Sequence, residues 1–144
     1  METGLSTDRK TELLGGVELF RSVAPEHLAS IAERLVEVEY PAGATIVRAG
    51  EIGTGFFIVA GGAVRVVRDG KTIARLGPGE FFGELSLLDR QPRIAQVVAD
   101  EDTLCLALPS WDFERILLAE PALTLAILRT VAARLRAVVD LARQ

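Results

Sequence analysis

The chain has very few of the residues that build disulfides, metal sites and nucleophilic active sites. Its 144 residues include one cysteine, Cys105, and one histidine, His27. A single cysteine cannot form an internal disulfide, which favours a reducing, cytoplasmic setting. A single histidine cannot supply a cluster of metal ligands, and neither Ser86 nor Ser110 has a histidine at a plausible position to act as its base. The composition therefore predicts no metal, no cofactor and no catalytic activity.

Long apolar runs and a positive net charge are also missing. The longest stretch without a charged side chain, residues 52–64, contains four glycines and is too short to cross a bilayer. The amino-terminal residues include Glu2 and Asp8 and lack the apolar core of a signal peptide. The net charge is −4, which argues against broad nucleic-acid binding. We therefore expect a cytoplasmic protein that binds no membrane and, by itself, no nucleic acid.

Short strand patterns occupy the middle of the chain. Alternation of apolar and polar residues begins at residue 36, and Asp69-Gly70 between two alternating segments is a strong hairpin signal. The pattern predicts strands at residues 36–40, 45–47, 56–59, 64–68, 71–76, 96–99 and 103–108. We expect about eight strands in all, separated by glycine and proline turns. Many short strands with this spacing predict a sandwich, barrel or jelly roll.

Helical patterns lie on both sides of the strands. Residues 5–14 predict a short helix ended by Gly15-Gly16, residues 17–23 an apolar connector, and Pro25 the start of a second helix. Ser110 is expected to cap a third helix, and Pro121 to open a last helix that continues to residue 144. We predict one domain over residues 1–144, with a helical segment at 1–35, strands at 36–108 and helices at 109–144.

The last predicted helix is longer than a small β domain needs, at about 35 Å. Its apolar stripe consists of Thr124, Leu128, Val131, Leu135, Val138 and Ala142, widened by Ala132 and Val139. Two interpretations stay open. The stripe packs only on its own domain, or part of it contacts a ligand, a second copy or a downstream domain. The four arginines after residue 128 complement the helix dipole or attract an acidic partner.

One segment carries most of the chemical information. It reads Phe82-Gly83-Glu84-Leu85-Ser86 and, after six residues, Arg93-Ile94-Ala95. A glycine allows close approach of backbone, a carboxylate accepts from a sugar hydroxyl, and an arginine pairs with a phosphate. The combination suits a small anion that also carries a hydroxyl. The alternatives are a solvated loop acid for Glu84, and a surface pairing of Arg93 with Asp89 or Asp100.

In this order and strand context, the segment resembles the phosphate-binding cassette of the cyclic nucleotide-binding domain family. That family supplies the sensor module of cAMP receptor proteins, kinase regulatory subunits and gated channels. The resemblance covers the chain from about Phe20 to the last helix. It implies an eight-stranded antiparallel β-roll, a form of jelly roll, with N-terminal helices and two C-terminal helices. The cassette would span residues 82–95 and form a short helix between two strands.

The resemblance also implies roles for individual residues. Arg93 would pair with the cyclic phosphate, Glu84 would accept from the ribose 2′-OH, and Gly83 would let the chain pass close to the sugar. Backbone N–H groups near Leu85 and Ser86 would point at the phosphate. Further contacts with the ligand are expected from Phe82, Ile94, Ala95, Val66, Ile73, Arg134 and Val138.

Two departures from the family pattern concern the base. Ile94 stands where the family usually has a small or hydroxylic residue, and a threonine there is associated with cGMP preference. We therefore expect cAMP as the ligand, with cGMP as the alternative. On the last helix, Val138 and Val139 stand where the catabolite activator type offers hydroxyls to adenine. Base recognition by apolar contact would discriminate poorly.

The sequence thus predicts a non-catalytic cAMP sensor that couples ligand binding to movement of its C-terminal helix. Its partners would be a cyclic nucleotide and, through that helix, a second copy or an effector domain. One alternative is a degenerate interaction or dimerisation module that binds no ligand. The other is a regulatory fragment of a larger effector protein, such as a DNA-binding regulator with a further helix-turn-helix domain.

Overall fold

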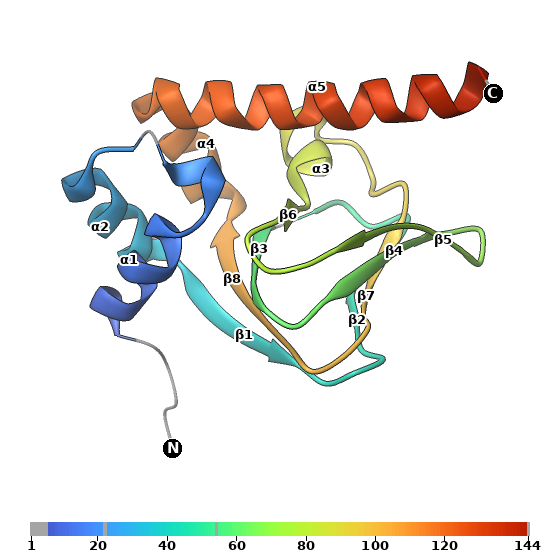
Figure 1. Ribbon diagram of the computed structural model, residues 1–144, viewed down its shortest axis with the longest axis horizontal. Helices are drawn as coiled ribbons and strands as arrows, with labels where there is room; N and C mark the ends of the chain where they lie inside the picture. Colours follow the sequence, from blue (N-terminus) through green and yellow to red (C-terminus); the bar gives the residue numbers. More distant parts are fainter. Residues whose placement is uncertain (1–5, 22, 54, 144) are drawn as a thin grey trace.

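The computed structural model describes residues 6–21, 23–53 and 55–143. Within these residues, eight strands form two four-stranded sheets, with helices at one end and along one side (Figure 1). Residues 5 and 144, which we predicted to be helical, and residue 22 of the predicted connector lie outside the described residues.

Every described strand pairing is antiparallel, which confirms the predicted β-roll. The first sheet has the order β1 (Val36–Tyr40), β8 (Thr103–Pro109), β3 (Gly55–Gly61) and β6 (Phe81–Phe82). The second has the order β2 (Thr45–Val47), β7 (Gln96–Ala99), β4 (Val64–Arg68) and β5 (Lys71–Leu76). The sequence pattern did not show β6, because two residues are too few for an alternation to be visible.

The Asp69-Gly70 hairpin between β4 and β5 forms as predicted. Both turn residues have a positive φ, 52° at Asp69 and 76° at Gly70, as a type I′ turn requires. The register changes within this hairpin, because Val66 lies opposite Ala74 whereas the next residue on β4 lies opposite Thr72. Ile73 is therefore the extra residue of a β-bulge.

The N-terminal helices and the first sheet share one core. The helices are α1 (Thr7–Gly15), the 3-10 helix η1 (Glu18–Phe20) and α2 (Pro25–Arg34). Residues 18–20 of the predicted connector are therefore helical, and α2 begins at Pro25 as expected. Leu14 and Phe20 are buried in a cluster with Phe56 of β3, and the ring of Phe56 lies 5.3 Å from that of Phe81 and 4.9 Å from that of Phe113.

The C-terminal helices are α4 (Ser110–Ala119) and α5 (Pro121–Arg143). Ser110 does not cap α4, so that prediction is wrong: Pro109 holds the cap position, and Ser110 is the first helical residue. Pro109 ends β8 in an extended conformation, and the helix begins directly after it. Asp112 of α4 is buried and accepts from Arg34 of α2 over 3.0 Å, which links the two groups of helices.

Helix α5 lies along one side of the molecule, beside α4 and the short helix α3 (Glu84–Asp89), and its C-terminal half continues beyond both (Figure 1). Leu123 and Ile127 near its start are buried. Five of its large apolar residues are exposed, namely Leu125, Leu128, Leu135, Val138 and Val139. This exposure favours the interpretation in which part of the helix contacts something other than its own domain.

Among the described residues, no single helix is long and apolar enough to cross a bilayer. Only α4 and the part of α5 up to Asp140, taken together, reach that length and apolarity, and the two are bent by 111°.

Candidate functional site

The cassette predicted at residues 82–95 forms a turn and a short helix between β6 and β7. Gly83 precedes the helix with φ 96°, in the left-handed region that favours glycine. A Cβ added there would lie 2.8 Å from the carbonyl oxygen of Gly55 and 3.2 Å from Nη1 of Arg93. Gly83 is therefore required both by its backbone angle and by the lack of space for a side chain. The cassette helix α3 starts directly after it.

Glu84, the first residue of α3, is 4% exposed and so is not a solvated loop acid. Its Oε1 accepts from Nη1 of Arg134 on α5 over 2.7 Å. Nη2 of the same arginine donates to the carbonyl oxygen of Phe81 over 2.7 Å, and the guanidinium lies 4.4 Å from the centre of the Phe81 ring. One arginine of α5 thus contacts the cassette through an ion pair, a hydrogen bond and an aromatic ring.

Arg93 lies close to Gly83 and against the loop that precedes β3. Its Nη2 donates to the carbonyl oxygen of Gly55 over 3.1 Å, and a Cβ added at Gly53 would lie 2.4 Å from that nitrogen. Burial lowers the pKa of Arg93, while the negative charges of Glu84 and Glu51 oppose this effect. Because an arginine stays protonated in proteins, the site contains a half-buried cation.

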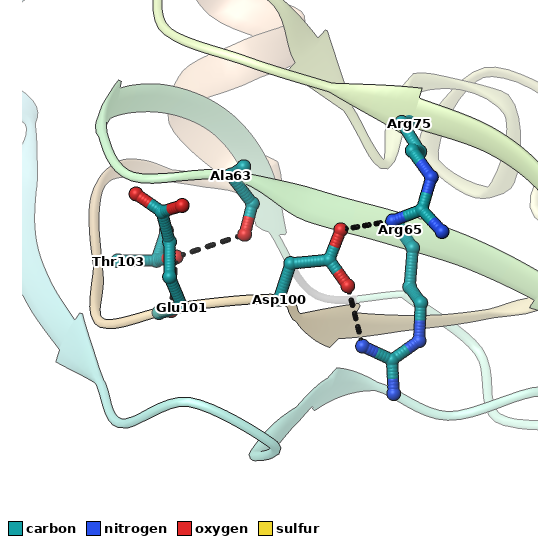
Figure 2. Close-up of polar contacts among 6 residues, drawn as sticks. All are labelled: Ala63, Arg65, Arg75, Asp100, Glu101 and Thr103. Carbon is teal, nitrogen blue, oxygen red and sulfur yellow. Dashed lines mark hydrogen bonds and ion pairs between the residues drawn. The ribbon is translucent and has the colours of Figure 1, made fainter.

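One of the two acids that could have competed for Arg93, Asp100, is bound elsewhere. Asp100 accepts from Nη1 of Arg65 on β4 and from Nη1 of Arg75 on β5, as Figure 2 shows. These contacts, the hydrogen bond from Arg65 above all, lower the pKa of Asp100. Thr103 in the same view donates to the carbonyl oxygen of Ala63 over 3.0 Å. The proposed surface pairing of Arg93 with Asp100 is therefore not the arrangement in the structure.

Ser86 has a structural task. It is 6% exposed, and its Oγ accepts from the backbone N–H of Gly53 over 2.8 Å and donates to the carbonyl oxygen of Gln91 over 2.7 Å. The backbone of Arg93 adds two hydrogen bonds to the same loop, its N–H to Glu51 and its carbonyl oxygen from Gly50, each of 2.8 Å. The hydroxyl of Ser86 thus positions the loop against which Arg93 lies.

The remaining predicted contacts fall into two groups. Phe82 belongs to the core, since it is 4% exposed and its ring stacks on Phe57 at 5.0 Å. Val66 is half-buried and packs against the second core cluster, on the inner side of the roll. Three of the others are exposed, namely Ile73, Ile94 and Val138, and Ala95 is half-buried. Leu85 is the second residue of α3.

Our sequence reasoning missed the glycines that make room for Arg93. Gly53 and Gly55 approach its guanidinium so closely that a side chain at Gly53 would collide with it. The spacing Gly50-x-x-Gly53-x-Gly55 was the available signal, because glycines set so closely before an apolar strand often mark a close approach of backbone. The contact from Arg134 to Phe81 was not visible in the sequence, because 53 residues separate them.

Comparison with known proteins finds a matching family model and related sequences. Residues 37–120 match the family model of the cyclic nucleotide-binding domain. The chain is 38% identical over 126 residues to the cyclic AMP receptor protein of Thermus thermophilus, covering 84% of this chain and 58% of that protein. It thus spans less than two-thirds of that relative's length.

Solved structures agree with this match. The regulatory chain PfPKA-R with cAMP bound has a TM-score of 0.85 at 27% identity, covering 94% of this chain and 47% of that one. The regulatory subunit of a cAMP-independent protein kinase A from Trypanosoma brucei has a TM-score of 0.78 at 26% identity, covering 87% and 47%. One of these structures has cAMP bound and the other belongs to a cAMP-independent kinase, yet both share the fold of this chain. The fold alone therefore does not identify the ligand, which depends on the residues of the site.

Proposed function

The chain belongs to the cyclic nucleotide-binding domain family, and on this premise we propose that it is a cAMP sensor. Domains of this kind in receptor proteins and kinase regulatory subunits are regulatory modules and not enzymes. The observation that carries the proposal is the placement of Glu84 and Arg93 at Gly83: Glu84 follows this glycine directly, and Nη1 of Arg93 lies 3.2 Å from the position of a Cβ there. An acid and an arginine so placed match the two ends of a ribose cyclic phosphate.

Arg93 would hold the phosphate. A guanidinium has five N–H donors, and the carbonyl oxygen of Gly55 takes only one of them. Arginine pairs with phosphate through two parallel hydrogen bonds, which a half-buried position strengthens because little water competes. Backbone N–H groups of Leu85 and Ser86 at the start of α3 would share the negative charge.

Glu84 would hold the ribose. Its carboxylate has two oxygens, and Oε1 is engaged by Arg134. A carboxylate oxygen has two acceptor positions, so Oε2 remains suited to a hydroxyl donor. The ribose can therefore bind without breaking the ion pair to α5.

The same ion pair would couple ligand binding to the C-terminal helix. Arg134 is the residue through which α5 contacts both the acid of the site and the carbonyl oxygen of Phe81. A ligand can shift the position of α5 only if it binds one position more tightly than the other. A ribose hydroxyl that donates to Glu84 would supply such a difference, because Glu84 is the acid to which Arg134 is bound.

A second copy of the chain is the partner that we propose for α5. Leu125, Leu128, Ala132, Leu135 and Val139 are exposed and recur at alternating spacings of three and four residues, as in a coiled-coil seam. Arg129 and Arg136 follow the two seam leucines directly and are also exposed. An antiparallel pair would bring these arginines of the two copies together, so the charges favour parallel helices.

Analytical ultracentrifugation tests this interface. We expect a dimer that Leu135→Glu converts to a monomer, whereas Leu118→Glu, at a still more exposed leucine of α4, leaves it dimeric. A wild-type monomer at all concentrations would contradict the interface and favour an effector domain as the partner. A dimer that binds no nucleotide would favour the interaction module over the sensor.

Calorimetric titration with cAMP tests the sensor itself. We expect saturable binding to the wild-type chain, and no binding at millimolar cAMP would contradict the proposal. A cytoplasmic location, the preference for cAMP over cGMP, and the lack of nucleic-acid, membrane and cofactor binding stay predictions.

A further inference from the structure

Glu51 lies opposite Arg93, on the loop that precedes β3. The N–H of Arg93 donates to the carbonyl oxygen of Glu51, and the N–H of Gly50 donates to the carbonyl oxygen of Arg93, each over 2.8 Å. The neighbouring residues Ile52 and Pro92 form an antiparallel bridge. Gly50 and Glu51 thus both oppose Arg93, as in a β-bulge that begins with a glycine of positive φ, here 85°. Residues opposed across antiparallel strands have Cβ atoms about 5 Å apart, so the backbone places the side chain of Glu51 beside that of Arg93.

Glu51 is exposed, and its charge is not neutralised by an ion pair. In the part of the chain that the structure describes, no cation lies within ion-pair distance of its carboxylate. The charge still reaches Arg93, because burial lowers the pKa of Arg93 and the charges of Glu84 and Glu51 oppose that change. Glu84 differs from Glu51 in that Arg134 pairs with it over 2.7 Å. Glu51 therefore acts on the site as an unpaired acid.

A phosphate held by Arg93 would be repelled by this charge. Arg93 and Arg134 are positive whereas Glu84 and Glu51 are negative, so the charges of these four side chains cancel before a ligand binds. A cyclic phosphate diester adds one negative charge, whereas a phosphate monoester adds nearly two above its second pKa of about 6. Coulomb repulsion is proportional to the charge of the ligand, so Glu51 opposes a monoester about twice as strongly as a cyclic diester.

We propose that Glu51 determines specificity for the charge of the phosphate: its carboxylate, opposite Arg93, disfavours the doubly charged phosphate of a nucleoside monophosphate relative to the singly charged cyclic phosphate. The inference rests on the proposed function and adds a residue that need not touch the ligand. Arg93 alone attracts the larger charge more strongly, and Glu51 offsets this preference. If water and salt screened the charge of this exposed acid completely, the preference would not depend on Glu51.

Titration of the wild type and Glu51→Gln with cAMP and with AMP at pH 8 tests the proposal, because AMP is doubly charged at that pH. We expect the variant to gain more affinity for AMP than for cAMP. The ratio of the AMP to the cAMP dissociation constant should fall by about fivefold at low salt, the effect of one additional unit charge ~4 Å away in water. The change should shrink in 1 M salt, where the Debye length is about 3 Å.

Two further variants are the controls. Glu51→Asp keeps the charge, and we expect it to keep the wild-type ratio. Glu39→Gln removes a charge from an exposed acid of β1, and an unchanged ratio there separates the effect of Glu51 from that of net charge. Equal changes for both ligands in Glu51→Gln, no change, or AMP binding too weak to measure in both proteins would overturn the inference and leave the proposed function intact. A wild type that binds no cAMP would overturn the proposed function itself.

Discussion

At the scale of single residues, the site depends on glycines as much as on charged side chains. The guanidinium of Arg93 lies close to Gly53 and Gly83 and donates to the carbonyl oxygen of Gly55. A Cβ at Gly83 would also lie within 2.8 Å of that carbonyl oxygen. Arg93 is half-buried, and its burial already lowers its pKa. The anion that neutralises such a cation gains a strong hydrogen bond, because little water competes.

Removal of this guanidinium should weaken cAMP binding. We expect Arg93→Ala to lose about 1.5–3 kcal/mol of binding free energy, the scale of a hydrogen bond to a charged group. Calorimetric titration measures the loss. Arg75→Ala is the control, since Arg75 is exposed and pairs with Asp100. Equal affinity of Arg93→Ala and the wild type would place the phosphate elsewhere.

A methyl group beside Arg93 should have a similar effect without removing any charge. The Cβ of Gly53→Ala would lie 2.4 Å from Nη2 of Arg93 and must displace it. We expect at least a tenfold loss of cAMP affinity, equivalent to about 1.4 kcal/mol. Gly61→Ala is the matched control, because no atom lies within 4 Å of the added Cβ there. Full affinity in Gly53→Ala would show that Arg93 does not need this position.

The single cysteine should be unreactive in the folded chain. Cys105 is fully buried in β8, and burial raises the pKa of its thiol to about 12. Because the thiolate is the reactive form, we expect reaction with a thiol reagent at pH 8 only in denaturant. Rapid labelling of the native chain would contradict this burial.

At the scale of elements, the β4–β5 hairpin is held by Asp100 as well as by its turn. The pKa of Asp100 is lowered, so its contribution to stability is present above the unfolded value of about 3.9 and is lost as the pH falls through the lower folded value. We expect Asp100→Asn to lower the melting temperature at pH 7 and to flatten its decline below about pH 4. Asp69→Asn, at the exposed turn, is the control. Parallel melting profiles of Asp100→Asn and the wild type from pH 7 to pH 3 would argue against the pairing.

The sequence predicted those elements that have a strong local signal. The Asp69-Gly70 turn, Pro25 and Pro121 each marked a boundary that the structure confirms. The two residues of β6 and the single turn of η1 lack such a signal, because neither is longer than one period of its pattern. Ser110 had the right chemistry for a cap, but the preceding Pro109 took the position.

The site was predictable only in part, for a related reason. The cassette residues Glu84 and Arg93 stand close together in the sequence, so one motif contained both. The backbone N–H of Ser86 was expected near the phosphate, but the sequence did not show that its hydroxyl accepts from the N–H of Gly53. The ion pair of Glu84 with Arg134 joins residues that are 50 positions apart. Such contacts arise from the packing of α5 on the roll, which no local pattern shows.

At the scale of the whole molecule, the site and the main core meet at Phe81. Its ring packs on Phe56 in the core and lies under Arg134 of α5, and its carbonyl oxygen accepts from that arginine. On the proposed function, a ligand on Glu84 would act on Arg134, the residue that joins α5 to the cassette. The exposed seam of α5 would pass this change to a second copy.

Loss of Arg134 should loosen α5 before it affects the roll. Arg134→Met removes the partner of a buried carboxylate, which costs about 1.5–3 kcal/mol. We expect faster amide hydrogen exchange in the C-terminal half of α5 with little change in the sheets. Arg136→Met, one exposed arginine further along, is the control. Unchanged exchange in Arg134→Met would mean that this contact does not hold the helix.

The measurement that tests the central claim most directly is a crystal structure with cAMP bound. We expect the cyclic phosphate within hydrogen-bond distance, about 3 Å, of the Arg93 guanidinium. We also expect the ribose 2′-OH at Glu84, with Ile94 and Val138 against the base. A nucleotide bound elsewhere, or an empty cassette at saturating cAMP, would contradict the account.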